Sequence, residues 1–275
     1  MTELEIDNTV HRIDGKDRGD ELTFSVCTLV TDPQQYATVL ESFRERGFSG
    51  QNSEFLIIDN SVSNKFDGYS GIRAFLRCAR GEYVVVCHQD VELVDDGYAE
   101  LKACLEALDE LDSGWAIAGN SGLSGIGRWA LRISDPVFEN ERIGKLPAEV
   151  RSLDENLLII KRASLLTPSH DLEGFHFYGL DLCLQAHLQG NRAYVIDFHL
   201  RHHSRGTKSL SYHDGLQRLE KKYAKLVSGQ LIQTTCDLVF LGSYYRFRFL
   251  RRVLRKLFRE TTRHDALQTQ QTRSV

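Results

Sequence analysis

The chain of 275 residues lacks any long hydrophobic run. No stretch approaches the ~20 consecutive apolar residues that a membrane-spanning helix needs, so we expect no transmembrane segment. The first residues are polar and acidic, with Glu3, Glu5 and Asp7, and do not resemble a signal peptide. Internal repeats and low-complexity blocks are also missing. Together with a hydrophobic content of 41% and a charged content of 26%, these absences favour a globular, cytoplasmic protein.

Paired cysteine motifs are absent as well. The chain has six cysteines, but no two of them form a CxxC pair, and several fall within apolar segments. A disulfide framework or a zinc site would need a more regular spacing. We therefore expect reduced thiols in the core of a cytosolic protein.

Acidic residues are absent from one basic segment near the C-terminus. Seven basic residues lie between Arg246 and Arg259, and subtracting them from the net charge of −4 leaves −11 for the rest. Apolar residues recur there at helical spacing from Leu241 onward, which predicts a basic amphipathic helix too charged to span a bilayer. One hypothesis is contact with an anionic membrane surface. The alternatives are packing on the main domain or on a second subunit, or attraction to the acidic body of the same chain.

Strands alternate with helices along most of the chain. This order predicts an α/β fold with a mostly parallel sheet flanked by helices, followed by a C-terminal helical appendage. We expect a poorly ordered lead-in over 1–20, one domain over 21–227 and a helical tail over 228–275. The predicted strands are 22–30, 54–58, 83–87, 115–118, 156–160 and 193–196, the predicted helices are 33–46, 71–80, 98–111 and 181–190, and a glycine-rich stretch covers 119–127.

Polar side chains follow two of the predicted strands. The apolar run Val84–Cys87 reads as a buried strand, and His88, Gln89 and Asp90 come directly after it. Ligands of open α/β sheets bind at the carboxyl ends of strands, and an Asp there offers oxygen to a divalent cation. Asp59, Asn60 and Ser61 follow another strand in the same way. The structural alternatives are a helix N-cap for Asp90 and a simple turn at 59–61.

Two further segments carry candidate side chains. Asp181 opens a predicted helix, where a carboxylate interacts well with the helix dipole and can also be fixed as a general base. The second segment holds His199, His202, His203 and Arg205. It is either an exposed basic loop or the source of one histidine that completes a site built on Asp90, with Arg205 able to meet phosphate. No regular spacing supports a zinc cluster.

These segments, in this order, resemble family-two glycosyltransferases with the GT-A (Rossmann-like) fold. Asp59-Asn60-Ser61 and Ala79–Tyr83 leading into His88-Gln89-Asp90 are similar to the nucleotide-binding half. The acceptor half is similar over Trp115–Gly119, Ser152–Glu155, Phe175–Tyr178 with Asp181–Leu184, and His202–Gly206. The closest likeness is the bacterial "glycosyltransferase-like" branch that has HQD where most relatives have DxD. The resemblance spans roughly residues 22–215.

The resemblance implies a role for each matching residue in the donor half. Asp59, with Asn60 beside it, would contact the nucleotide. Asp90 would bind Mn²⁺ or Mg²⁺ that bridges the diphosphate. His88 replaces the first acid of the usual motif, which touches the ribose in relatives, and Arg205 would join the donor site.

In the acceptor half, Asp181 matches the acid proposed as catalytic base. His202 matches a histidine near the metal, with His203 as the fallback. Relatives often have Glu-Asp where Tyr178 and Gly179 stand here.

The expected function is therefore an inverting, metal-dependent glycosyltransferase in cell-surface polysaccharide synthesis, which uses a nucleotide-sugar donor and a glycan or lipid-linked acceptor. No nucleic-acid partner is expected, and the oligomeric state stays open. We expect the protein in the cytoplasm, with the inner face of the membrane as a hypothesis. The departures at 88 and 178–179 motivate one alternative, an inactive GT-A domain that serves as a binding or assembly subunit. A nucleotidyltransferase is a second alternative, but Thr28–Gln35 lacks the glycine-rich basic loop that it would need.

Overall fold

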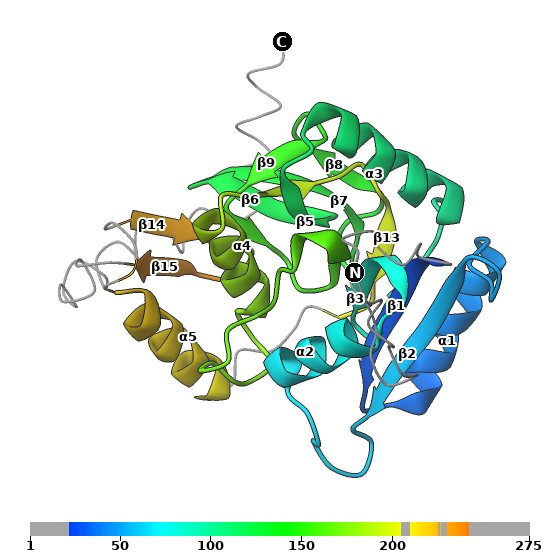
Figure 1. Ribbon diagram of the computed structural model, residues 1–275, viewed down its shortest axis with the longest axis horizontal. Coiled ribbons are helices and arrows are strands. Elements are labelled where there is room, and N and C mark those ends of the chain that lie inside the picture. The colour runs from blue at the N-terminus through cyan, green and yellow to red at the C-terminus, as the bar shows by residue number, and fades with distance from the viewer. Residues whose placement is uncertain (1–21, 205–209, 225, 227–229, 242–275) are drawn as a thin grey trace, which may run out of the picture.

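The computed structural model describes residues 22–204, 210–224, 226 and 230–241. Strands and helices alternate as expected, and the strands and helices predicted between residues 22 and 196 are present within a few residues (Figure 1). The helices are α1 (Pro33–Glu45), α2 (Gly68–Cys78), α3 (Tyr98–Leu111), α4 (Tyr178–Leu188) and α5 (Leu210–Tyr223), and a short 3₁₀ helix, η1, covers Arg162–Ser164.

A seven-stranded sheet in the order β2-β1-β3-β11-β5-β12-β9 forms the centre of the fold. Strands β2, β1 and β3, coloured blue to cyan in Figure 1, are parallel, whereas β11 is antiparallel to both β3 and β5. The sheet is therefore mixed, and its parallel half is the half predicted to hold the nucleotide. The strands are β1 (Leu22–Val30), β2 (Ser53–Asp59), β3 (Gly81–Cys87), β5 (Trp115–Gly119), β9 (Ala148–Val150), β11 (Leu157–Lys161) and β12 (Arg192–Val195).

Alternating side chains of β3 pack on opposite faces of the sheet. Tyr83 and Val85 belong to a cluster with α1 and α3, whereas Val84 and Val86 belong to a cluster with α2, α4 and α5. Both faces are thus covered by helices, which explains the uninterrupted apolar run in this strand. The polar residues His88, Gln89 and Asp90 follow the carboxyl end of this strand.

A second sheet, in the order β10-β6-β7-β13-β4 with β8 beside β7, includes the glycine-rich segment. A Cβ atom at Gly122 would lie 2.3 Å from the Ser152 carbonyl oxygen, so the glycine permits the close pairing of β6 and β10. Strand β13 pairs with β4, and His202 stands opposite Val91. The strands are β4 (Val91–Glu92), β6 (Ser121–Gly125), β7 (Arg128–Ser134), β8 (Glu141–Ile143), β10 (Ser152–Leu153) and β13 (Leu200–His202).

The last described residues correct one expectation. Strands β14 (Gln230–Gln233) and β15 (Leu238–Leu241) form an antiparallel hairpin within the segment predicted to be a helical tail. Ile232 and Val239 are buried in the same cluster as α4 and α5, so the hairpin belongs to the domain. The predicted basic helix beyond Leu241 lies outside the described residues, as does the lead-in over 1–20.

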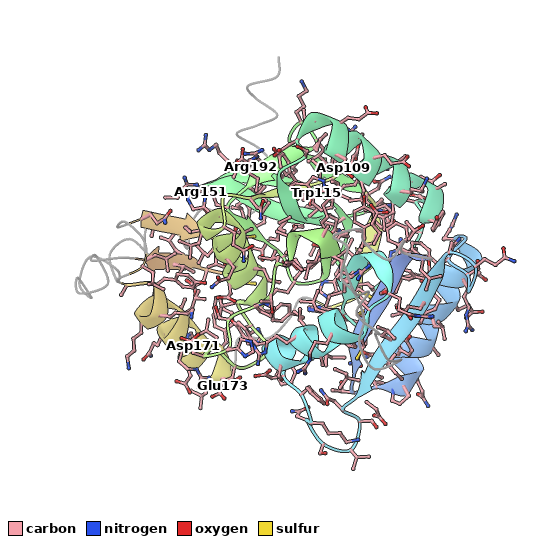
Figure 2. The ribbon with its side chains drawn as sticks, viewed as in Figure 1. Asp109, Trp115, Arg151, Asp171, Glu173 and Arg192 are labelled. Carbon is pink, nitrogen blue, oxygen red and sulfur yellow. The ribbon has the colours of Figure 1, made fainter. Side chains whose placement is uncertain are left out.

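Ion pairs attach α5 to the loop between η1 and α4. Arg218 pairs with Glu173 at 2.9 Å, and Lys222 pairs with Asp171; both acids lie beside α5 in Figure 2. Among the helices that the structure describes, none is long and apolar enough to cross a membrane.

Candidate metal and donor site

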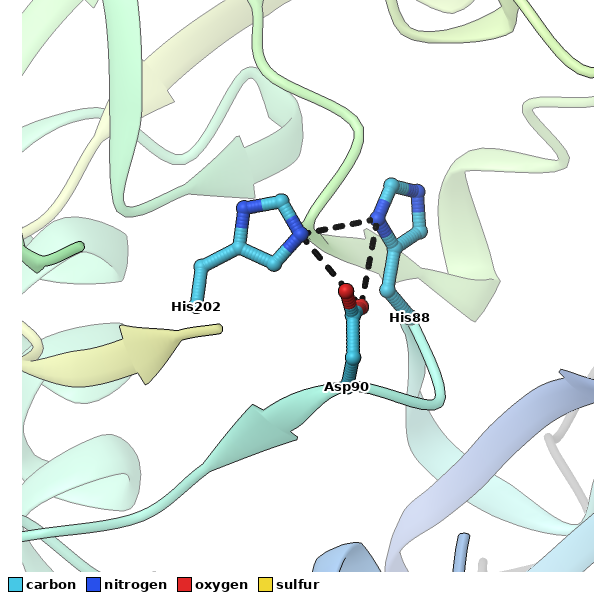
Figure 3. Close-up of side chains that lie close together, drawn as sticks. All are labelled: His88, Asp90 and His202. Atoms are coloured by element: carbon cyan, nitrogen blue, oxygen red, sulfur yellow. Dashed lines mark hydrogen bonds and ion pairs between the residues drawn. The ribbon is translucent and has the colours of Figure 1, made fainter. Parts of the chain in front are cut away.

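Three side chains converge just beyond the carboxyl end of β3 (Figure 3). The Nε2 atom of His202 lies 3.3 Å from Oδ1 of Asp90 and 3.4 Å from Nδ1 of His88. His88 Nδ1 is 4.0 Å from the same Asp90 oxygen. One ligand atom from each residue lies within 4.8 Å of the other two, which is close enough for a single cation to contact all three.

Backbone pairing brings these residues together. His88 and Asp90 follow the buried strand β3, and the His88 amide donates to the Asn156 carbonyl oxygen at 3.1 Å. His202 ends β13, and the amide of the next residue, His203, donates to the Asp90 carbonyl oxygen at 3.0 Å. The site therefore depends on the pairing of β13 with β4, between residues far apart in the sequence.

The electrostatics of the cluster suit a cation. Burial opposes the ionised form of Asp90, but the hydrogen bond from His202 and the nearby imidazoles hold its pKa well below the usual range. Burial and the charge of His202 lower the pKa of His88, which favours its neutral, ligating form. Burial also opposes charge on His202, but its bond to Asp90 and the charge of Asp90 raise its pKa.

A cavity of about 260 Å³ adjoins the cluster. It lies between the carboxyl ends of β1 and β3 and the first turns of α2, with Thr31, Gly68 and Ile72 among its lining residues. The hydroxyl of Tyr178 lines it too and lies 3.1 Å from Nε2 of His88. The Gln89 side chain accepts from the amides of residues 31 and 32 and so holds the β1–α1 loop at the cavity rim.

The two residues predicted beyond β2 do not line this cavity. Asp59 is exposed, and its Oδ1 accepts from the amide and hydroxyl of Ser61 at 2.9 and 2.6 Å. These bonds lower its pKa. Asn60 is 4% exposed, donates to the Phe66 carbonyl oxygen and accepts from the Lys65 amide. Asn60 thus closes the loop over 60–66, which agrees with the alternative of a structural turn rather than with a nucleotide contact. Asp59 remains accessible at the end of the strand beside β1.

Asp181 is fully buried within the first turn of α4. Its oxygens accept from the Ser169 amide at 2.7 Å, the Ser169 hydroxyl at 2.6 Å and the Tyr223 hydroxyl at 2.7 Å. Burial raises its pKa despite these bonds. A catalytic base must reach the acceptor hydroxyl, so this burial argues against the predicted role and favours a structural one.

Two acids that sequence reasoning did not single out as catalytic, Asp154 and Glu155, follow β10. The charge of Asp154 acts on both His88 and His202. Its neighbour Glu155 accepts from the Gly179 amide at 3.1 Å and from the two preceding amides, so it caps α4 from another part of the chain. Burial raises the pKa of Glu155 to about 8. In the sequence, the one local feature that points to these two residues is that two acids stand side by side directly after β10.

The three histidines of the predicted cluster have different partners. His202 joins the metal cluster, and His203 bonds Glu92 at 3.0 Å. His199 is fully buried between Asp95 and Ser134, at 3.0 and 2.9 Å. This Asp-His-Ser chain resembles a hydrolase triad, but the serine is also buried and accepts from the Asn140 amide, so no substrate reaches it. Arg205 lies outside the described residues.

The chain has a GT-A-type glycosyltransferase fold. It is similar to TarS 1–349 from S. aureus in complex with UDP-GlcNAc, with a TM-score of 0.50 and 12% identity over 74% of this chain and 67% of that one. A mannosyltransferase from Pyrobaculum calidifontis, in complex with GDP-Man and Mn²⁺, aligns with a TM-score of 0.47 and 13% identity over 72% of this chain and 61% of that one.

At the sequence level, the chain belongs to the family of the protein "ATP synthase subunits region ORF 6" of Fuscovulum blasticum. The two are 42% identical over 227 residues, which are 80% of this chain and 91% of that protein. The relative's name gives the place of a reading frame and states no activity. No family model matches the sequence.

Proposed function

We propose that this protein transfers a sugar from a nucleotide-diphosphate donor to a hydroxyl group, with a divalent cation at His88, Asp90 and His202. The observation that carries the proposal is the convergence of these three ligands beside a cavity at the carboxyl end of parallel strands. The TarS structure that shares this fold contains UDP-GlcNAc, which supports a nucleotide-sugar donor.

The ligand set fits Mn²⁺ or Mg²⁺ with room for phosphate oxygens. One carboxylate and two imidazoles leave part of the coordination sphere open on the cavity side, and imidazole nitrogen favours Mn²⁺ over Mg²⁺. When bound, the cation would supply a Lewis acid for the leaving diphosphate. His88 is oriented for this role by the Tyr178 hydroxyl on its other ring nitrogen.

The rest of the donor would occupy the cavity between β1, β3 and α2, because this cavity adjoins His88 and Asp90. Asp59 is accessible beyond the end of β2, two strands from β3 at a spacing of about 4.8 Å per strand, where a nucleoside could reach it. Arg205 follows the metal cluster by three residues in sequence, and we keep its predicted phosphate contact as part of the proposal.

We place the proton acceptor at Asp154 rather than Asp181. Asp154 is partly exposed and its charge is felt by both histidines, whereas Asp181 is enclosed by three hydrogen bonds. Glu155 is less suited, because a pKa of about 8 leaves it largely protonated at neutral pH. Attack by an acceptor hydroxyl with Asp154 as base would give single displacement and inversion.

The acceptor class also remains part of the proposal. By the family resemblance it is a glycan or a lipid-linked intermediate of polysaccharide synthesis, handled at the cytoplasmic face of the membrane. An inactive GT-A domain that binds nucleotide sugars without transferring them is the second candidate. The burial of Asp181 favours it, since the acid matching the usual base cannot reach a substrate.

The test is a binding and turnover assay against UDP-, GDP- and dTDP-sugars, with Mn²⁺ or with EDTA. Asp90→Asn keeps the size of the side chain but removes its charge, and Glu106→Gln removes an exposed charge that pairs with Lys102 on α3. We expect one donor class to bind in Mn²⁺, with binding weakened in Asp90→Asn and unchanged in Glu106→Gln. Binding without any hydrolysis or transfer would select the inactive domain. Equal binding by both variants would contradict the metal assignment.

A further inference from the structure

A second cavity, of about 270 Å³, lies at the other end of β3. Its walls come from the C-terminal half of α2 and from η1 with the loop that follows. The Nε atom of Arg162 in this wall donates at 2.8 Å to the carbonyl oxygen of Gly81, the first residue of β3. His88 follows the last residue of that strand, so about 20 Å separates the two regions at ~3.3 Å per residue. This cavity is therefore distinct from the metal cluster.

Positive charge collects around this cavity. Arg73, Arg77 and Arg162 line it together with His170. In the part of the chain that the structure describes, neither Arg73 nor Arg77 forms an ion pair with a carboxylate, although the whole chain has a net charge of −4. Guanidinium groups gathered in one cavity repel one another unless an anion lies between them, and their planar donors match phosphate oxygens.

The arginine nearest the core is fixed in place. Arg73 Nη1 donates to the Ser169 carbonyl oxygen at 2.7 Å, and the amide and hydroxyl of Ser169 are in turn held by Asp181. The loop that carries Thr167 and His170 is thus anchored to α4 through a buried carboxylate. A cationic wall that is already positioned loses little side-chain entropy when it binds a ligand.

Apolar side chains lie among the arginines in the same lining. Leu76, Leu165 and Leu166 line the cavity, and Leu165 is 82% exposed with a left-handed backbone φ of 55°. This conformation is unusual for a leucine and presents an apolar side chain to solvent beside the arginines. A ligand that contacts both the arginines and the leucines needs an anionic group and an apolar portion.

We propose that this cavity binds a phosphate or phosphomonoester group, with an apolar part of the ligand against Leu165. The chemistry is shared by a free phosphorylated metabolite and by the headgroup of an anionic lipid such as phosphatidic acid. The site is independent of the donor cavity, so its existence does not rest on the proposed glycosyl transfer.

Calorimetry with the full chain in EDTA tests the proposal, because without a divalent cation the donor site should not retain phosphate. The probes are inorganic phosphate and dihexanoyl phosphatidic acid below its micellar concentration. Arg77→Gln should weaken both by ~10-fold or more, since one charge-assisted contact to phosphate is lost. Arg44→Gln removes the same charge from α1, outside the cavity, and should change neither affinity.

A substitution at Leu165 distinguishes the two sources of phosphate. If the lipid binds more tightly than inorganic phosphate, and Leu165→Ser removes only that difference, the ligand is an amphiphile. Equal affinities that Leu165→Ser does not change would overturn the apolar contact and leave a phosphate site for a free phosphorylated metabolite. The proposal is overturned if neither probe binds a protein of unchanged melting temperature, or if Arg77→Gln and Arg44→Gln weaken binding equally, which would show general electrostatic attraction only.

Discussion

Replacing Asp181 by alanine should destabilise the protein without a specific effect on the donor site. The carboxylate is fully buried and accepts three hydrogen bonds, two from Ser169 and one from Tyr223. Truncation leaves these donors buried without that acceptor. Each buried donor left without an acceptor costs about 1–3 kcal/mol.

The three losses are not equal. The Ser169 amide has a fixed direction and no other partner in the network, whereas both hydroxyls keep the bond that they accept from Gln185 Nε2 at 3.0 and 2.9 Å and can rotate their O–H bonds away from the lost acceptor. We therefore expect Asp181→Ala to lower the free energy of unfolding by about 3–5 kcal/mol in total. Asp181→Asn keeps one acceptor oxygen and should cost about 2 kcal/mol.

Urea denaturation measures these losses, and donor binding by the folded fraction provides the second readout. Tyr223→Phe is the matched partner, because it removes one donor of the same network, and its cost should not add fully to that of Asp181→Ala. The reasoning is refuted if Asp181→Asn is as stable as the native protein while turnover falls ~10²–10⁴-fold, the usual effect of losing a general base.

The other predictions concern single side chains. Burial raises the pKa of Glu155 to about 8 in the folded protein, so between pH ~4.5 and ~8 the native state holds a proton that the unfolded state has released. The free energy of unfolding of the wild type should therefore fall with rising pH in this window, relative to Glu155→Gln, by at most about 1.4 kcal/mol per pH unit. A difference in urea midpoints that does not change with pH would contradict this. Asn60→Ala should lower the free energy of unfolding by about 2 kcal/mol, because the side chain closes the 60–66 loop through three hydrogen bonds; an unchanged midpoint would remove that role. His202→Ala should raise the Mn²⁺ concentration needed for donor binding, whereas His203→Ala, which loses only a bond to Glu92, should not; the reverse order would give the metal role to His203.

The secondary structure of the central sheet was predictable because its signals are local. The run Val84–Cys87 is apolar since helices cover both faces of β3, and α1 begins at a proline after the capping Asp32. The β6–β7 hairpin in the glycine-rich stretch was missed. Gly122 allows a close contact with β10, which is distant in sequence, and such a contact leaves no periodic pattern.

The candidate site was predictable to the extent that it follows from strand ends. Asp90 and His88 were picked out because they follow a buried strand, and the structure places them in one cluster with His202, whereas the resemblance related His88 to a ribose contact. The choice of His202 among three histidines depends on the β13–β4 register, which the sequence alone does not reveal. For Asp181, the sequence predicted the helix correctly but did not predict that the side chain would be buried.

The central claim is that His88, Asp90 and His202 bind the cation that holds the donor diphosphate. The most direct test is pulsed electron paramagnetic resonance of Mn²⁺ bound to the protein with a nucleoside diphosphate. The account predicts nitrogen couplings from two imidazoles, one of which is lost in His202→Ala and the other in His88→Ala. A Mn²⁺ signal without nitrogen coupling, unchanged by either substitution, would contradict it.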